Sequence, residues 1–149
     1  MKARDLMTGH PHVVMPGDPV SRAAEIMRDQ DVGALPVVDD GARMRLRGVI
    51  TDRDIAVRCT AAGHRPTCPV EAHMTAGPLD TVTPDADVRS VMELMKDARV
   101  RRLMVAEDGR LVGVIAQADL ARREGPVDPV EVERVLERIS EPAREAAHA

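Results

Sequence analysis

Short apolar runs and longer amphipathic stretches alternate along this chain, in an order that occurs twice. Residues 34–38 (ALPVV) and 103–106 (LMVA) are apolar runs whose length suits buried strands. Before each run, apolar side chains recur at helical spacing: Val20, Ala23, Ala24, Ile26 and Met27 in the first stretch, and Val91, Met92, Leu94 and Met95 in the second. The pattern therefore predicts a helix ahead of each strand, with the methionines as ordinary core side chains.

These stretches belong to an internal repeat, in which residues 5–58 align with residues 72–123. A short insertion at residues 42–45 interrupts the register in the first copy. The matched pairs include Met7 and Met74, Val14 and Val82, Leu35 and Leu103, and Gly41 and Gly109. A repeat of this length indicates one supersecondary unit used twice.

Each copy contains the same strand-to-helix junction. In residues 48–54 (GVITDRD), a small and apolar run leads into Thr51, and Asp54 follows three residues later. A threonine there can accept from the free N–H groups of a helix start, and a carboxylate suits the positive first turn. Residues 113–119 (GVIAQAD) repeat the pattern with Ala116 in place of the threonine. Groups at such a junction point into the space above the sheet edge, where a ligand can bind.

Each copy is predicted to fold as strand, helix, strand, strand, helix. The first strand is the apolar segment at Val13 and Val14, and a helix begins at residues 18–19 (DP), with Asp as cap and Pro in the first turn. Turn signals at residues 39–41 (DDG) and 108–109 (DG) join the next two strands. Since a single copy leaves one apolar sheet face uncovered, the predicted class is α+β, with two repeats packed sheet to sheet in pseudo-twofold symmetry.

The repeats are placed at residues 4–58 and 72–123, with a Gly-, Pro- and Thr-rich linker at residues 59–71. Residues 126–141 predict a separate C-terminal helix that Asp128 caps, and residues 142–149 predict a frayed tail. The helix has an apolar stripe at Val132, Val135, Leu136 and Ile139. The stripe is expected to pack on the chain's own module, with a dimer contact as the alternative.

Composition excludes several classes of function. The 149 residues are 44% hydrophobic and 31% charged, a balance typical of a soluble globular protein. The formal net charge of −4 disfavours nucleic acid and anionic membranes as partners, and the chain has no Phe, Trp or Tyr on which bases could stack. Neither a membrane-spanning apolar run nor a signal-peptide core is found, so we expect a cytoplasmic protein.

Motifs of catalysis are not evident either. The sequence contains no nucleophile elbow, phosphate-binding glycine loop or metalloprotease helix. Asp52 and Asp54 lie close together, but paired carboxylates at a helix start are more often caps than acid–base partners. We therefore predict that the protein is not an enzyme.

The recurring motifs resemble a CBS domain pair, also called a Bateman module. The resemblance rests on the Met-Thr pair, the Val-x-Pro segment, the Leu-Pro-Val-Val strand and the Gly-Val-Ile-Thr-x-x-Asp junction, and it covers residues 4–123. It implies a stand-alone bacterial regulatory module that requires no cofactor and binds an adenosyl effector, an adenine nucleotide (AMP, ADP or ATP) or S-adenosylmethionine, in clefts between the repeats. It also implies a disc-like homodimer assembled through helices.

For the first cleft, the resemblance implies that Asp54 holds the ribose hydroxyls. A carboxylate only accepts hydrogen bonds, and a vicinal diol offers two donors to it. Thr51 and Arg53 from the same copy, and Thr81 from the other copy, are the further implied contacts.

For the second cleft, the resemblance implies the equivalent carboxylate, Asp119, as the ribose contact. Arg101 and Arg102 precede a strand at the positions where the family often contacts phosphate. The first strand of the other copy contributes Val13 or Val14.

Two departures from the family pattern leave the ligand open. Ala116 removes a hydroxyl from the Asp119 cleft, and residues 33–34 (GA) stand where the Asp54 cleft would have the arginine pair, so that Arg53 is its nearest cation. The retained Thr51 and Asp54 favour an adenosyl-ligand sensor. The departures favour the alternative, a ligand-free dimerisation or interaction module with an unidentified protein partner.

A third interpretation concerns the linker. Cys59, His64, Cys68 and His73 are ligand types that suit zinc, with four, three and four residues between them. The spacing matches no compact zinc knuckle, and linker His and Cys residues more often pack or face solvent, so no metal is predicted. A metal- or redox-responsive linker is therefore the less favoured interpretation. A Cys59–Cys68 disulfide is also less favoured, because the cytoplasm is reducing.

Overall fold

The structure is a computed structural model that describes residues 1–122 and 129–140. The chain divides into two compact units. Residues 10–79 and 108–111 form the repeat-1 unit, and residues 1–9, 80–107, 112–122 and 129–140 form the described part of the repeat-2 unit. Each unit contains its own sheet and its own hydrophobic core.

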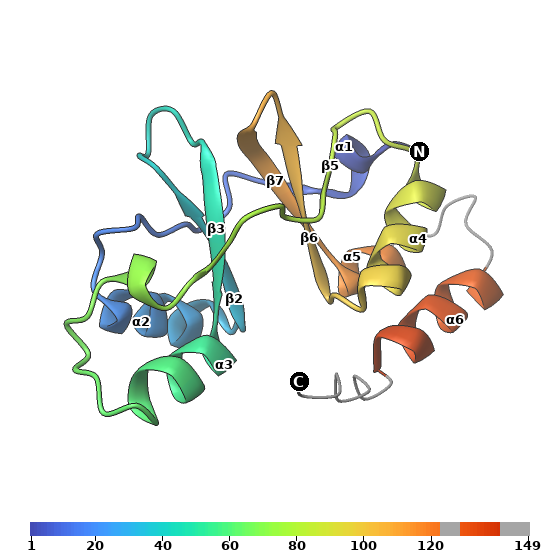
Figure 1. Ribbon diagram of the computed structural model, residues 1–149. Coiled ribbons are helices and arrows are strands. Elements are labelled where there is room, and N and C mark those ends of the chain that lie inside the picture. Colours follow the sequence, from blue (N-terminus) through green and yellow to red (C-terminus); the bar gives the residue numbers. More distant parts are fainter. Residues whose placement is uncertain (123–128, 141–149) are drawn as a thin grey trace. The chain divides into compact units, whose positions relative to one another are not determined.

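The repeat-1 unit, whose two longer strands β2 and β3 are labelled in Figure 1, has a three-stranded sheet in the order β2-β3-β4. Its strands are β2 (Ala34–Val38), β3 (Leu46–Thr51) and β4 (Thr75–Ala76), and neighbouring strands are antiparallel. Its helical elements are α2 (Val20–Gln30), α3 (Asp52–Asp54), the π-helical continuation η1 (Ile55–Thr60) and the 3₁₀ turn η2 (Val70–Ala72).

The repeat-2 unit has a four-stranded sheet in the order β1-β7-β6-β5. Its strands are β1 (Thr8–Gly9), β5 (Thr81–Val82), β6 (Arg102–Glu107) and β7 (Arg110–Ala116), of which the first two residues of β7 are counted with the repeat-1 unit. Its helices are α1 (Ala3–Leu6), α4 (Val88–Ala98), α5 (Gln117–Arg122) and α6 (Pro129–Ser140). No helix in the described part of the chain is long and apolar enough to cross a membrane.

Strand register confirms the repeat alignment. Val82 pairs in parallel with Val105 in one unit, and Val14 forms the matching parallel bridge to Val37 in the other. The predicted turn between β6 and β7 is also present, because Asp108 and Gly109 both have positive φ, as a tight hairpin turn requires. The two copies are therefore built on one plan, a mixed helix-and-strand fold as predicted.

The short strands that begin the two repeats are exchanged. β1, from the start of the first repeat, pairs with β7, whereas β4, from the start of the second, pairs with β3. Both pairings lie against a glycine. A Cβ atom on Gly48 would lie 2.6 Å from the Thr75 carbonyl oxygen of β4, and one on Gly113 would lie 2.5 Å from the side-chain sulfur of Met7, the residue before β1. The first residues of each sequence repeat therefore belong to the compact unit formed mainly by the other repeat.

The predicted helical faces are largely buried. Val20, Ala23 and Met27 of α2 are at most 7% exposed, and Val91, Met92 and Met95 of α4 at most 1%. Ala24 was expected on the buried face and is instead exposed, because it lies about 100° around the helix from the buried Ala23. Methionine thus fills both cores, as predicted.

The helix start predicted at Asp18 is wrong in its detail. α2 begins at Val20 with Pro19 in the capping position and with no side-chain cap. Asp18 instead accepts a hydrogen bond from the Met15 backbone N–H at 2.8 Å, so its carboxylate closes the turn before the helix.

The C-terminal helix packs on its own unit. Val135 and Ile139 of α6 join the core cluster that includes α4 and α5 side chains, with Val132 packed against it. This confirms the predicted packing of the stripe for Val132, Val135 and Ile139, while Leu136, its fourth member, is half-buried. The predicted cap at Asp128 and the tail at residues 142–149 lie outside the described residues.

Replacement of Gly48 by alanine tests the close strand approach. Because the added Cβ would meet backbone rather than a flexible side chain, we expect Gly48→Ala to lower the free energy of unfolding by about 1–3 kcal/mol. Urea unfolding followed by far-ultraviolet circular dichroism measures this. Gly41→Ala, which meets nothing within 4 Å, is the control and should leave stability unchanged or slightly raised. Equal effects of the two substitutions would refute the proposed constraint.

Candidate ligand-binding site

The junction between β3 and α3 holds its first turn by a reciprocal capping box. The Asp54 backbone N–H donates to the Thr51 hydroxyl at 3.0 Å, and the Thr51 backbone N–H donates to Asp54 Oδ2 at 3.0 Å. Both hydrogen bonds satisfy donors that the end of a strand and the start of a helix would otherwise leave free. The predicted capping role of Thr51 and Asp54 is therefore confirmed.

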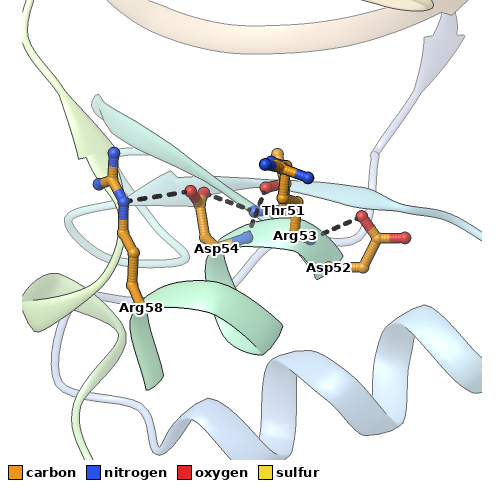
Figure 2. Close-up of polar contacts among 5 residues, drawn as sticks. All are labelled: Thr51, Asp52, Arg53, Asp54 and Arg58. Atoms are coloured by element: carbon orange, nitrogen blue, oxygen red, sulfur yellow. Dashed lines mark hydrogen bonds and ion pairs between the residues drawn. The ribbon is translucent and has the colours of Figure 1, made fainter. Parts of the chain in front are cut away.

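The second oxygen of Asp54 is less occupied. Oδ1 lies 3.7 Å from Nε of Arg58, whose side chain is 55% exposed, while the Asp54 side chain is 12% exposed. Figure 2 shows the Asp54 carboxylate between Thr51 and Arg58. A carboxylate can accept about four hydrogen bonds, so Asp54 keeps acceptor capacity for a ligand hydroxyl. Sequence reasoning missed Arg58, although its position four residues after Asp54 on a helix was a usable signal.

The junction between β7 and α5 keeps only half of this box. The Ala116 backbone N–H donates to Asp119 Oδ2 at 2.8 Å, but Ala116 has no hydroxyl to return the bond. Asp119 is half-buried. The two copies thus present the same carboxylate in the same backbone setting, with one contact fewer in the second.

A further backbone hydrogen bond is shared by the two junctions. The Asp52 N–H donates to the Gly33 carbonyl at 2.9 Å, and the Gln117 N–H donates to the Arg101 carbonyl at 2.9 Å. Gly33 and Arg101 are therefore equivalent, as the alignment predicted. A Cβ atom on Gly33 would lie 3.1 Å from the Asp52 carboxylate, so this position has little room for a side chain.

The repeat-2 unit therefore brings two of the predicted residue types together. Arg101 immediately precedes β6, its backbone carbonyl accepts from Gln117 at the start of α5, near the Asp119 carboxylate, and its side chain is exposed. Arg102 begins β6 and is half-buried. One cation and one carboxylate at the same sheet edge can contact the phosphate and the ribose of a nucleotide.

The remaining predicted contacts are divided between the units. Thr51, Arg53 and Asp54 belong to the repeat-1 unit, and Arg53 is exposed. Thr81 lies in β5 of the repeat-2 unit, opposite Met104.

Val14 has its side chain in the hydrophobic core of the repeat-1 unit. It is 1% exposed, and its backbone bonds to Pro36 at 3.1 Å and to Val38 at 2.9 Å. Val13, the alternative named from the sequence, is half-buried.

Three of the four linker residues with zinc-type ligand atoms lie together. One ligand atom from each of His64, Cys68 and His73 falls within 4.8 Å of the other two. Cys59 is outside this group; its thiol lies 3.9 Å from the His64 carbonyl and 3.8 Å from that of Arg65. Cys59 and Cys68 are free thiols.

Comparison with models of protein families identifies the family of this chain. The CBS domain model matches residues 3–59 and 70–125, which are the two repeats. The chain therefore belongs to the CBS domain family and carries a CBS pair, as its motifs predicted. CBS pairs generally act as regulatory, non-catalytic modules.

Curated relatives of similar size support this assignment. Hypoxic response protein 1 of Mycobacterium tuberculosis is 35% identical over 120 residues, which is 80% of this chain and 82% of the relative. The CBS domain-containing protein YhcV of Bacillus subtilis is 37% identical over 118 residues, 79% of this chain and 81% of the relative.

Solved structures are similar over most of the chain. Hypoxic Response Protein I with two coordinated zinc ions has a TM-score of 0.74 at 34% identity and covers 84% of this chain and 100% of its own. CBSX2 in complex with AMP has a TM-score of 0.68 at 28% identity, with coverages of 81% and 93%. The CBS pair of MJ0100 in complex with 5′-methylthioadenosine and S-adenosyl-L-methionine has a TM-score of 0.70 at 26% identity, with coverages of 84% and 100%.

Removal of the Thr51 hydroxyl should remove the hydrogen bond that it accepts from the Asp54 backbone N–H at the helix start. We expect Thr51→Ala, which recreates the alanine found at position 116, to lower the free energy of unfolding by about 0.5–2 kcal/mol. Urea unfolding monitored by circular dichroism provides the measurement. Thr51→Ser keeps the hydroxyl and serves as the control. A stability loss in the serine variant equal to that in the alanine variant would show that the hydroxyl is not the cause.

Proposed function

We propose that this chain is a cytoplasmic, non-catalytic regulatory CBS pair that binds an adenosyl effector. The observation that carries the proposal is the Asp54 carboxylate. Its side chain is 12% exposed and fixed by the capping box, yet its Oδ1 lies 3.7 Å from the exposed Arg58 guanidinium, which is longer than a hydrogen bond and leaves acceptor capacity. A fixed carboxylate with spare acceptor capacity suits a ribose diol, which has two donors.

The two junctions differ in the charge that surrounds the carboxylate. Arg101 lies beside the start of α5 and Arg102 follows it, so the Asp119 site is proposed to favour a phosphate-bearing ligand such as AMP. Gly33 and Ala34 occupy the equivalent positions near Asp54, where Arg53 and Arg58 are the nearby cations. The Asp54 site is proposed to bind the adenosyl group with less dependence on phosphate.

Two relatives with solved structures support the ligand class. One was solved with AMP, and the other with 5′-methylthioadenosine and S-adenosyl-L-methionine. All three ligands share an adenosine, which is the part that the junction carboxylates are proposed to recognise. To act as an effector, the ligand must bind one conformation of the module more tightly than another.

Ligand binding is tested by titration calorimetry of ligand-free protein with AMP, ADP, ATP and S-adenosylmethionine. Because the chain has no Tyr or Trp, an adenine carried through purification would also dominate the near-ultraviolet spectrum. We expect Asp119→Asn to weaken AMP binding, and Asp54→Asn to weaken binding at the other site, each by at least about tenfold, since each removes a charge-assisted hydrogen bond.

The control for both variants is Asp52→Asn, which removes an exposed carboxylate from the same junction. It should bind as the unmodified protein does. If none of the four ligands binds, the sensor proposal fails, and a ligand-free interaction module takes its place.

We further propose a homodimer that forms through the helical face of the repeat-1 unit. Val57, on η1, is 51% exposed, and α2 borders an open groove of about 410 Å³ that Ala24, Ile55 and Cys59 help to line. Exposed apolar side chains beside a groove between helices are typical of an interface.

Substitution of Val57 tests this surface. We expect Val57→Glu to convert a dimer into a monomer in light scattering after size exclusion, because it places a charge in the contact. Val130→Glu is a matched control, since Val130 is 52% exposed on α6 of the other unit. An unmodified protein that is already monomeric would refute the proposal.

A further inference from the structure

A cluster of soft ligand atoms lies in the loop that joins the two repeats. His64 follows the end of η1, Cys68 precedes η2, and His73 ends η2. We propose that these three side chains bind one zinc-type divalent cation within the repeat-1 unit. The proposed metal site is independent of the adenosyl ligand.

Geometry supports a common metal position. His64 Nδ1 lies 3.8 Å from Cys68 Sγ, the His64 and His73 ring centroids are 5.1 Å apart, and the three ligand atoms all lie within 4.8 Å of one another. With metal–nitrogen bonds of about 2.0–2.1 Å and a metal–sulfur bond of about 2.3 Å, ligand atoms in a tetrahedral site are roughly 3.3–3.6 Å apart. Small side-chain rotations therefore suffice to bind a metal.

His73 provides a second, independent observation. The residue is 4% exposed, and its buried Nε2 atom has no hydrogen-bond partner among the residues that the structure describes. A buried imidazole nitrogen without a partner is unfavourable, and such groups are uncommon in folded proteins. Binding of a cation by the His73 imidazole gives this buried side chain the interaction that it lacks.

The backbone holds the ligand loop against α2. The Cys68 carbonyl accepts from the Val20 N–H at 2.8 Å, the Pro66 carbonyl accepts from the Ser21 N–H at 3.0 Å, and Cys68 N–H donates to Arg65 at 3.0 Å. These bonds satisfy free donors at the helix start and fix the loop at the same time. A site placed on such a fixed loop needs little reorganisation to bind metal.

Cys59 supports the loop rather than binding the metal. It is 2% exposed, and its thiol is directed at the carbonyl groups of His64 and Arg65. Its own carbonyl accepts from the His64 N–H at 3.0 Å. The end of η1 is thereby tied to the first ligand.

The donor set selects the class of cation. Two imidazoles and one thiolate suit zinc and its close analogues, whereas magnesium and calcium require oxygen ligands. Among the described residues, no further His, Cys, Asp or Glu atom joins this group. The fourth position is thus available to water or to an external ligand, as in open zinc sites.

Cobalt(II) is the probe, used on the untagged, metal-free full-length chain. We expect saturation at one cobalt per chain, with thiolate-to-cobalt absorption in the near ultraviolet that no Tyr or Trp obscures. Zinc should then displace the cobalt and abolish the absorption. Saturation without a thiolate band would overturn the assignment, because Cys68 would not be a ligand.

Variants separate this site from other metal contacts. His64→Ala and Cys68→Ser change residues that are not buried in the core, so both should fold, and each should weaken cobalt binding at least tenfold. His12→Ala, an exposed histidine outside the cluster, and Asp54→Asn should leave cobalt binding unchanged. Circular dichroism confirms that each variant is folded.

Cys59→Ser decides between the two thiols. It should keep the thiolate-to-cobalt band, because Cys68 remains. Loss of the band in Cys59→Ser with retention in Cys68→Ser would overturn the proposed ligand set, and so would unchanged binding in His64→Ala.

Discussion

Both sheets depend on the pairing of a short strand from the start of one repeat with a central strand of the other repeat: β1 pairs with β7, and β4 pairs with β3. β4 lies so near to Gly48 that a single added carbon would clash with the Thr75 carbonyl oxygen. β1 pairs with β7 at Gly113, where the space above the glycine is filled by the side chain of Met7, the residue that precedes β1. Each unit therefore completes its sheet with a strand from the start of the other repeat. The Asp54 and Asp119 carboxylates lie just after the central strands β3 and β7. The positions of these carboxylates therefore depend on how β3 and β7 are paired.

Asp54 combines a structural and a proposed binding role in one side chain. One oxygen stabilises the helix start, and the other faces the edge where Arg58 reaches it. The same helical segment leads through η1 to Cys59, whose carbonyl and thiol contact the loop of the proposed metal site. A ligand at Asp54 and a cation at His64 would therefore act on opposite ends of one short helical segment within a single unit.

The sequence by itself determined the repeat, the main helices and central strands of each copy, the caps at Thr51 and Asp54, and the family. It did not predict the short elements α1, β1, η2 and β4, and the strand expected at Val13 and Val14 is only a bridge from Val14 to Val37. These features depend on local signals: apolar periodicity, glycine in turns, and a hydroxyl and a carboxylate three residues apart. The loss of the hydroxyl at Ala116 was visible in the same way, and the half-formed box at Asp119 is its direct result. The α2 start was mispredicted because Asp18 closes the preceding turn instead.

Only the tertiary structure decided which distant residues meet. Exchange of β1 and β4 depends on long-range backbone pairing that no local pattern encodes. The linker histidines and Cys68 have no recognised metal spacing, yet the loop folds back on α2 and brings them together while Cys59 is left apart. Sequence spacing sets which side chains are available, but the distance between their ligand atoms is set by how the backbone between them satisfies its own hydrogen bonds.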